Sequence, residues 1–469
     1  MYKLLLCWRY LLTRYLALVC IVSVLLGVAI LIVVNSVMAG FSTKLRERLH
    51  AALSDVVVQS WDYTGMNDPQ GKMDLIRADP DLNSRIVAMT PTIEIFAMLQ
   101  FTVNDTPVVR AVRLIGVDPE GRAALGGFAE YLTNQADPAH PSFELSQAAL
   151  NHYKAKRVQM APRPQPLVSP DGSPLPDAPP SNPTAVPEGA FLGYAIAHVR
   201  DPKSTPEHPR PDLELLAPGD DVVLTTVTDG EIRPVRYRYV VSDYYHSEMS
   251  EYDSQYVFVP LKHLQMLRNM DDRVTAIQVR LKDYNKDHKK VEERLRQLFG
   301  AEGVQVSSWE ELQGPLLAAI AVERGILNVL LFMIVGVAGF GILAIFSMIV
   351  VEKTRDIGIL KALGASNWGV LKIFIGYGLL LGIVGAGLGT ALGVTITTYI
   401  NQIEHGLALV TGQDIFPRDI YYFKDIPTDM QPMTVLFINL GAVGIAVLFS
   451  ILPALRAALL HPVRALRYE

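Results

Sequence analysis

Residues 16–39 contain no charged side chain, and this stretch restricts the fold more than any other feature of the sequence. A helix rises ~1.5 Å per residue, so about 20 apolar residues cross the ~30 Å hydrocarbon core of a membrane. The apolar core of a cleaved signal peptide is only about 7 to 15 residues long. The stretch is too long for a signal peptide, and we expect it to be a transmembrane helix.

Three more uncharged stretches are long enough to span a membrane with some tilt, namely 325–351, 373–400 and 433–455. The composition agrees with a membrane protein, since 50% of the residues are hydrophobic and only 19% are charged. The sequence therefore predicts an α-helical membrane protein with four transmembrane helices. A large α+β extracytoplasmic domain is inserted between the first and second helices in this prediction.

Positively charged residues predict the orientation, because Lys and Arg gather in the cytoplasmic loops of membrane proteins. Ten of them lie in the N-terminal segment 1–15, the loop 352–372 and the C-terminal tail 456–469. The loop 401–432 has only two, against five acidic residues. Both termini and the 352–372 loop are therefore expected in the cytoplasm, with 401–432 and the large domain 40–324 on the outer side.

The large domain alternates runs rich in Val, Ile, Thr and aromatic residues with helical patterns, which is typical of an α+β fold. The runs predict strands at 54–60, 85–101, 106–117, 221–227, 232–242, 255–259 and 274–281. Helices are expected at 41–53, 261–269 and 286–299. The last of these helices joins strands 274–281 and 302–306 in a βαβ unit. Asp229-Gly230 predicts a tight hairpin turn, since glycine accepts a positive φ.

A proline-rich insertion covers residues 162–187, with ten prolines in 26 residues. Such a composition buries too little apolar surface to offset the entropy of ordering the chain. We expect an exposed, extended loop, and a ligand for a proline-recognition domain is the alternative.

Composition excludes several classes of function. The net charge is −5 and the pI about 6.1, which leaves no basic excess for binding nucleic acid. Cys7 and Cys20 are the only cysteines, so no disulfide is expected in the large domain. The sequence has no GxxxxGK[ST] loop for ATP, no catalytic motif and no dense cluster of metal ligands. We therefore expect no enzyme activity, metal or cofactor on this chain.

The loop between the second and third predicted spans carries dense charges of both signs. If it is helical, Asp356, Ile357, Leu360 and Gly364 lie on one stripe. Gly364 suits the C-terminal end of this helix, and Ser366 can cap a second helix. The pattern predicts a short amphipathic helix on the cytoplasmic surface. An interfacial linker held by ordinary ion pairs is the alternative.

Residues 352–366 read EKTRDIGILKALGAS and closely resemble the E-K-x-R-x-I-G-I-L-[KR]-A-L-G-A-S signature of MacB/FtsX/Lol-type (type VII) ABC transporter permeases. The exit of the first span, from Leu26 to Leu49, is similar to the lipoprotein-releasing LolC/LolE family. So is the C-terminal segment from Leu452 to Glu469. The order of spans agrees with that family, so the resemblance covers most of the chain apart from the proline-rich insertions.

The resemblance implies mechanotransmission, in which a separate ABC ATPase subunit dimer binds ATP and Mg²⁺ and moves the outer domain through long stalk helices. It implies that 352–366 docks in a groove of the ATPase, and that 41–53 and 308–324 are the stalks. Gly40 is the weak point of the first stalk. The residues expected to couple to the ATPase are Glu352, Lys353, Arg355, Asp356, Ile357, Gly358, Leu360, Lys361, Leu363, Gly364, Ala365 and Ser366.

The third predicted span carries a line of glycines, Gly378, Gly382, Gly385, Gly389 and Gly393. The last three are four residues apart, which puts a smooth groove on one helix face and lets another backbone approach closely. We expect close helix packing at this groove, and a face that slides during the transport cycle is the alternative.

The resemblance also implies a permease of the bacterial inner membrane that contacts membrane lipid, releases lipoproteins toward the outer membrane and pairs with a second permease subunit, identical or paralogous. A periplasmic lipoprotein carrier is a further partner. The carrier-binding loop of LolC has no counterpart here beyond the Asp229-Gly230 turn, so a paralogue or the proline-rich insertion are the alternative contacts for the carrier. Two other functions stay open, a MacB-like efflux permease for peptides or small hydrophobic molecules and an FtsX-like signalling permease that controls a cell-wall hydrolase.

Overall fold

The computed structural model describes residues 15–62, 64–135, 137, 140–159, 186–199, 201, 210–229, 233–247, 249–300, 303–411 and 425–461. The chain divides into two compact units. The helical unit comprises Met1–Leu45, Leu316–Phe416 and Lys424–Glu469, and the sheet unit comprises Arg46–Pro315 and Pro417–Phe423. The loop expected at 162–187 lies outside the described residues except at its last two positions.

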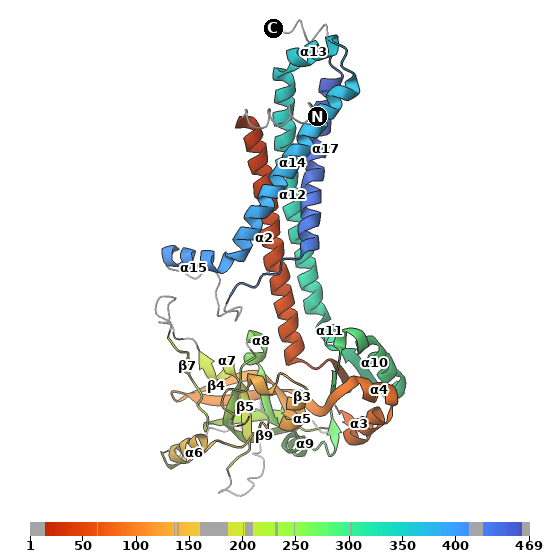
Figure 1. Ribbon diagram of the computed structural model, residues 1–469. Helices are drawn as coiled ribbons and strands as arrows, with labels where there is room; N and C mark the ends of the chain where they lie inside the picture. The colour runs from red at the N-terminus through yellow and green to blue at the C-terminus, as the bar shows by residue number, and fades with distance from the viewer. Residues whose placement is uncertain are drawn as a thin grey trace. The chain divides into compact units, whose positions relative to one another are not determined.

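Four long apolar helices build the helical unit (Figure 1). They are α2 (Tyr15–Ala52), α12 (Gly314–Glu352), α14 (Asn367–Thr398) and α17 (Pro432–Ala458). Each is long and apolar enough to cross a membrane. The four apolar helices expected from the sequence are therefore present, and α2 and α12 extend well beyond the stretches 16–39 and 325–351.

Two shorter helices flank α14. Helix α13 (Thr354–Ala362) precedes it, and α15 (Ile400–Thr411) follows it. Helix α15 lies almost entirely within 401–432, the connection expected between the last two spans. Ile403, Leu407 and Val410 repeat at the spacing of one helix face, which is the signal that identifies the helix.

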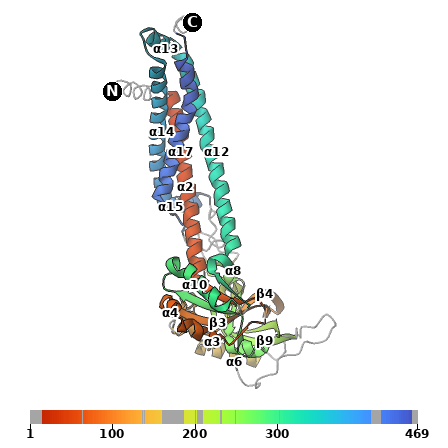
Figure 2. The ribbon, with the colours of Figure 1, turned by 90° about the vertical axis from the view of Figure 1, so that its right-hand side faces the viewer.

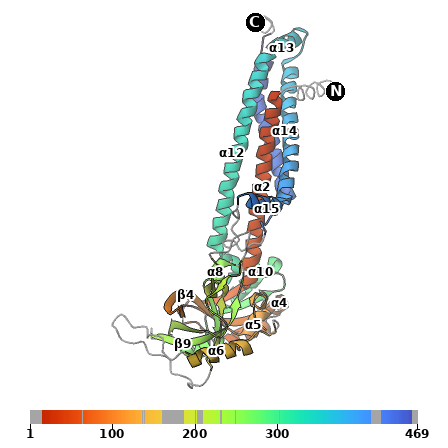
Figure 3. The same cartoon turned by 90° about the vertical axis from the view of Figure 1, so that its left-hand side faces the viewer.

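Side chains at four-residue spacing form the core of the helical unit. On α2 these are Cys20, Val24, Val28 and Ile32, and all are buried. Residues four apart share a helix face, so α2 presents one apolar stripe to the other helices. The partners of this stripe are Ile342, Phe346, Tyr377, Leu381, Ala442 and Ala446. Figures 2 and 3 show the four helices of this core packed side by side.

A nine-stranded sheet forms the centre of the sheet unit, in the order β13-β1-β12-β3-β4-β10-β5-β9-β8. Because β8 also pairs with β3, the strands from β3 to β8 in this order close into a barrel, and β12, β1 and β13 extend it. The strands are β1 (Val56–Ser60), β3 (Ile86–Val103), β4 (Thr106–Val117), β5 (Gly189–Gly193), β8 (Asp221–Val227), β9 (Pro234–Tyr245), β10 (Tyr256–Pro260), β12 (Ala276–Leu281) and β13 (Val304–Ser308).

Short elements complete the sheet unit. Two pairs of two-residue strands are β2 (Met66–Asn67) with β11 (Arg273–Val274), and β6 (His198–Val199) with β7 (Leu213–Glu214). The helices are α3 (Pro69–Ala78), α4 (Pro80–Arg85), α5 (Pro119–Ala124), α6 (Gln147–Gln159), α7 (Tyr194–Ala197), α8 (Ser250–Asp253), α9 (Leu261–Arg268), α10 (Tyr284–Phe299) and α11 (Trp309–Leu312).

The expected βαβ unit is present as β12, α10 and β13, with one difference. Both strands pair antiparallel with β1, which lies between them, so the two strands run parallel without touching. Helix α10 buries Val291, Leu295 and Phe299 at the spacing of a single helix face.

The expected tight turn at Asp229-Gly230 is wrong. Strand β8 ends at Val227 and β9 begins at Pro234, so their connection is longer than two residues. The Asp229 carboxylate pairs instead with Arg273 at 2.5 Å. A two-residue turn does join β3 to β4, where Asn104 and Asp105 have φ of 49° and 62°.

Candidate functional site

Helix α13 follows α12 after a one-residue break at Lys353. The Lys353 ammonium pairs with Asp356 at 2.6 Å, and the Thr354 hydroxyl donates to the carbonyl of Val350 at 2.9 Å. Gly364, with φ of 96°, lies just beyond the C-terminal end of α13. Ser366 then caps α14 by accepting from the N–H of Gly369 at 3.1 Å. The segment is therefore a helix with defined ends and not an irregular linker.

The inner face of α13 packs on the ends of the long helices. Ile357 is only 4% exposed, and Gly358 beside it is also buried. Ile357 lies in an apolar cluster with Val350, Val370, Ala457 and Ala458. The stripe predicted from Asp356, Ile357, Leu360 and Gly364 is thus divided. Ile357 is buried because one end of each of α12, α14 and α17 packs around it. Asp356, Leu360 and Gly364 are exposed.

The outer face of α13 is apolar and exposed. Leu360 is 45% exposed and Leu363 is 81% exposed, and Ile359 beside them is exposed as well. Trp368, in the first turn of α14, is 70% exposed. We call these four residues the α13 patch. Large apolar side chains that gather at an exposed surface are typical of a protein-binding site. Ile359 and Trp368 are absent from the predicted set. A tryptophan two residues after the predicted cap Ser366 is the sequence signal that could have identified Trp368.

The other predicted coupling residues surround the patch. Glu352, Arg355 and Asp356 are exposed, so charges of both signs border the apolar side chains. Ala365 is half-buried between Gly364 and Ser366. The segment thus combines an apolar centre with a charged rim, which is the composition of many protein interfaces.

Lys361 ties α13 to α17. Its Nζ donates to the carbonyl oxygens of Ala458 and Leu460 at 2.7 and 2.6 Å. These carbonyls lie at the C-terminal end of α17, where the helix dipole favours a cation. Lys361 therefore links α13 to α17, in addition to the chain connections of α13 to α12 and α14.

The glycines of α14 contact two different helices. A Cβ on Gly378 would lie 2.5 Å from the Ser450 hydroxyl, and a Cβ on Gly382 would lie 3.0 Å from the Ala446 methyl. Both partners belong to α17. Cβ atoms on Gly385, Gly389 and Gly393 would meet α2, at Val24 (2.8 Å), Leu25 (2.7 Å) and Ile32 (3.1 Å), respectively. The three glycines spaced four apart are therefore the place where α14 and α2 approach most closely.

The last turn of α2 is anchored in the sheet unit. Asp55 is 1% exposed, and its carboxylate contacts His50 Nε2 and accepts from the Leu281 N–H at 2.6 Å and from Arg280 Nη1 at 3.1 Å. The His50 ring stacks on Trp309 with 5.3 Å between centroids. Trp309 opens α11, directly before α12. The end of α2 is thus held to the sheet and to α11, the short helix directly before α12.

Removing this anchor gives a first prediction. Asp55→Ala leaves Arg280 and the Leu281 N–H without their acceptor, so we expect a loss of about 2 to 3 kcal/mol in the stability of the sheet unit. The measurement is the temperature at which trypsin begins to cut this unit in the purified full chain. Glu310→Ala is the control, because the ion pair of Glu310 with Arg46, at 3.4 Å, is exposed and worth less than about 1 kcal/mol. Equal protease resistance of the two variants would contradict the anchor.

Comparison with known proteins identifies the class. Residues 328–462 match the family model "FtsX-like permease C-terminal". The lipoprotein-releasing system transmembrane protein LolC of Xylella fastidiosa is 25% identical over 97% of this chain and 94% of its own length. LolE of Haemophilus influenzae is 28% identical over 46% of this chain and 51% of its own length. The macrolide export ATP-binding/permease protein MacB of Bdellovibrio bacteriovorus is 30% identical over 28% of this chain and 17% of its own length.

The four apolar helices and these matches together define a multi-pass permease of the inner membrane. The resemblance seen in the sequence is thereby confirmed. The chain is an ABC transporter permease of the Lol/MacB/FtsX type.

Proposed function

We propose that this chain is the permease subunit of a complex that releases lipoproteins from the inner membrane toward the outer membrane, with ATP hydrolysed by a separate ATPase dimer. The observation that carries the proposal is the α13 patch, an exposed apolar surface on a helix held to three of the long helices. Two relatives, which match 97% and 46% of the chain, are named as lipoprotein-releasing proteins. The patch and the charged residues around it are the ATPase-docking surface in this proposal.

Force passes from the patch to the outer side through α2 and α12. In this proposal both termini and α13 are cytoplasmic and the sheet unit is periplasmic. Helix α12 runs without a break from Gly314 to Glu352, and α2 from Tyr15 to Ala52. A continuous helix transmits a displacement along its axis, and the anchor around Asp55 delivers it to the sheet. Such work is needed because each CH₂ drawn out of a bilayer costs about 0.8 kcal/mol.

A second permease subunit and lipid cover the remaining apolar surface of the long helices. Helix α12 exposes large apolar residues around its middle, including Val329, Phe332, Met333, Val337 and Phe340. Their spacing of i, i+3, i+4, i+8 and i+11 places them on one broad face of the helix, which a neighbouring helix and lipid can cover. The cargo enters beside this surface in our proposal and passes to a periplasmic carrier, through this subunit or a paralogue.

The proposal is tested by reconstitution. The full chain, its ATPase and its second permease subunit are placed in liposomes that hold an acylated lipoprotein, and a soluble acyl-binding acceptor is added. We expect the lipoprotein to reach the acceptor only with ATP and Mg²⁺, and its unacylated form not to be handled. ATP-driven export of a small hydrophobic dye without lipoprotein release would favour the MacB-like alternative, which the match to MacB supports. No transport, with activation of a cell-wall hydrolase, would favour the FtsX-like role.

A second prediction concerns Lys361. Lys361→Met removes two charge-assisted hydrogen bonds to the end of α17, each worth about 1.5 to 3 kcal/mol. We expect the ATPase to co-purify as before, while the lipoprotein released per ATP hydrolysed falls several-fold. Lys361→Arg, which can still donate to both carbonyls, should restore part of the coupling. Loss of ATPase binding in the methionine variant would instead place Lys361 in the docking surface.

A further inference from the structure

Helix α15 leaves the bundle at the end of α14 opposite α13. Helix α14 ends at Thr398, and α15 begins at Ile400 after a single residue, Tyr399. Figure 1 shows α15 turned sharply away from the direction of α14. With 12 residues it is too short to cross a membrane and long enough to present a continuous face.

One face of α15 is apolar and exposed. Ile403, Leu407 and Val410 lie at the i, i+4 and i+7 positions of a single stripe, which we call the α15 stripe. Leu407 is 49% exposed and Val410 is 84% exposed. Gln402 and His405 occupy a second face, which is polar except for the exposed Leu409. The helix therefore has the two-sided character of a segment that lies at an interface between water and an apolar phase.

A short segment connects α15 to α2. The Asn401 side chain accepts from the N–H of Ile426 at 2.8 Å. The backbone of Pro427 then crosses α2 at Gly40, where a Cβ would be only 2.5 Å from its carbonyl oxygen. The N–H of Asp429 donates to the carbonyl of Ser36 at 2.9 Å. We call residues 425–431 the strap. Gly40 is thus the point where the strap passes, which explains a glycine within the long α2 helix.

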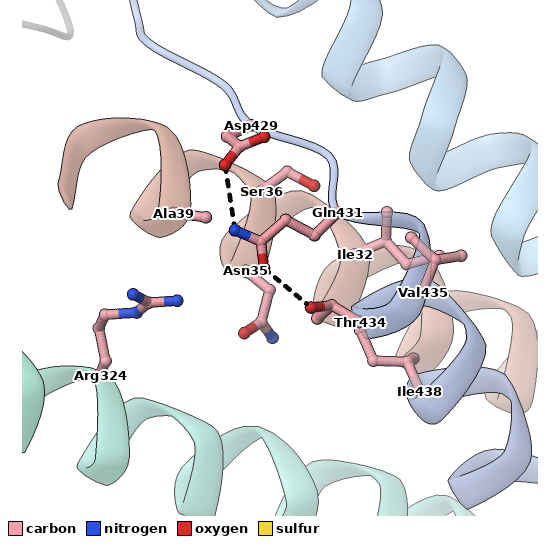
Figure 4. Close-up of a pocket in the computed structure, with 10 residues that line it drawn as sticks. All are labelled: Ile32, Asn35, Ser36, Ala39, Arg324, Asp429, Gln431, Thr434, Val435 and Ile438. Atoms are coloured by element: carbon pink, nitrogen blue, oxygen red, sulfur yellow. Dashed lines mark hydrogen bonds between the residues drawn. The ribbon is translucent and has the colours of Figure 1, made fainter. Parts of the chain in front are cut away.

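The end of the strap is held in place where it enters α17. Figure 4 shows the Gln431 side-chain amide between Asp429 and Thr434. Its Nε2 donates to the Asp429 carboxylate at 3.1 Å, and its Oε1 accepts from the Thr434 hydroxyl at 3.4 Å. Ser36 and Ala39 of α2 line the same small pocket. The strap therefore links α15, through Asn401, to α2 at Ser36 and Gly40.

The membrane surface is the partner that fits the α15 stripe. Helix α14 is one of the candidate spans, so a helix that starts two residues after its end lies where that span leaves the bilayer. Tyr399 at the junction is exposed, and tyrosine is enriched at the level of the lipid headgroups. A stable contact with another protein needs about 800 Å² on each partner, which three side chains on one helix do not supply.

We propose that α15 lies in the outer-leaflet interface with the α15 stripe among the acyl chains, and that the strap braces α2 against it. The assignment of α15 to the outer leaflet rests on the orientation given in the proposed function. The contact with lipid rests only on α14 being a membrane span. The first stalk then moves against a support fixed in the leaflet from which cargo is drawn.

The test uses spin labels on the full chain in liposomes of bacterial phospholipid, with Cys7→Ser and Cys20→Ser as background. Labels are attached at Leu407→Cys and Val410→Cys on the stripe, and at Gln402→Cys on the polar face as the matched control. We expect the stripe labels to be several-fold more accessible to oxygen, which partitions into lipid, than to a water-soluble nickel chelate. The control label should show the reverse preference.

Two results would overturn the proposal. Stripe labels as accessible to the nickel chelate as the control label place the stripe in water. Stripe labels that are immobile and shielded from both reagents place it against protein, such as a second copy of the chain. The measurement requires no ATPase and no cargo, so a failure of lipoprotein release leaves it unchanged. A lipid contact without such release would refute only the proposed function.

Discussion

Leu360→Asp is expected to abolish co-purification of the ATPase subunit with this permease. Leu360 is 45% exposed at the centre of the α13 patch, where docking would bury it. A carboxylate without a partner in an apolar groove costs about 3 kcal/mol or more, which is roughly 100-fold in affinity. The permease itself should fold normally, since Leu360 is not part of the buried cluster around Ile357 and is already 45% exposed. The measurement is the amount of ATPase retained by the tagged, detergent-solubilised permease.

Leu409→Asp is the matched control for this prediction. It makes the same chemical change at a side chain that is 78% exposed on α15, outside the α15 stripe, and should leave ATPase binding unchanged. Leu360→Met should also bind, because it keeps an apolar side chain of similar volume. Retention of the ATPase by the aspartate variant at position 360 would refute the docking surface. Retention by neither aspartate variant would show that the effect is not local to α13.

The long apolar helices could be predicted from sequence because their signal is local. A run without charge needs no knowledge of its neighbours to be recognised as a span. The strands rich in Val and Ile were visible for the same reason, and β4 and β8 have the predicted bounds. Strand β5 reads GAFLG and carries two glycines, which weaken a strand signal. It forms because β9 and β10 pair with it from both sides.

The candidate site was only partly accessible from sequence. The motif predicts where the helix and its caps lie, but periodicity does not say which face turns toward the rest of the chain. Ile357 and Leu360 are both apolar, yet one is buried by α14 and α17 and the other is exposed. The bonds of Lys361 join residues 97 and 99 positions apart in the chain, and no local pattern reports such a contact.

Gly389→Leu is expected to destabilise the packing of α14 against α2. A Cβ at this position would lie 2.7 Å from the carbonyl oxygen of Leu25 and 2.8 Å from the Cβ of Val28. Neither atom belongs to a flexible side-chain end, so the helices must separate, and overpacking of this kind costs about 1 to 3 kcal/mol or more. We expect a clear fall in the Tm of the purified full chain, followed as loss of the monodisperse peak after heating in detergent.

Gly387→Leu is the control, two residues earlier on the same helix. A Cβ there meets nothing within 4 Å, so the change in helix propensity is the same while the steric conflict is absent. The Tm of this variant should be unchanged or slightly raised, and equal losses in both variants would contradict the packing argument. Gly393→Ala separates packing from sliding, because its Cβ would meet Ile32 at a tight but adjustable 3.1 Å. Normal transport with a normal Tm fits static packing, whereas lost transport with a normal Tm would mean that α14 slides along α2 during the cycle.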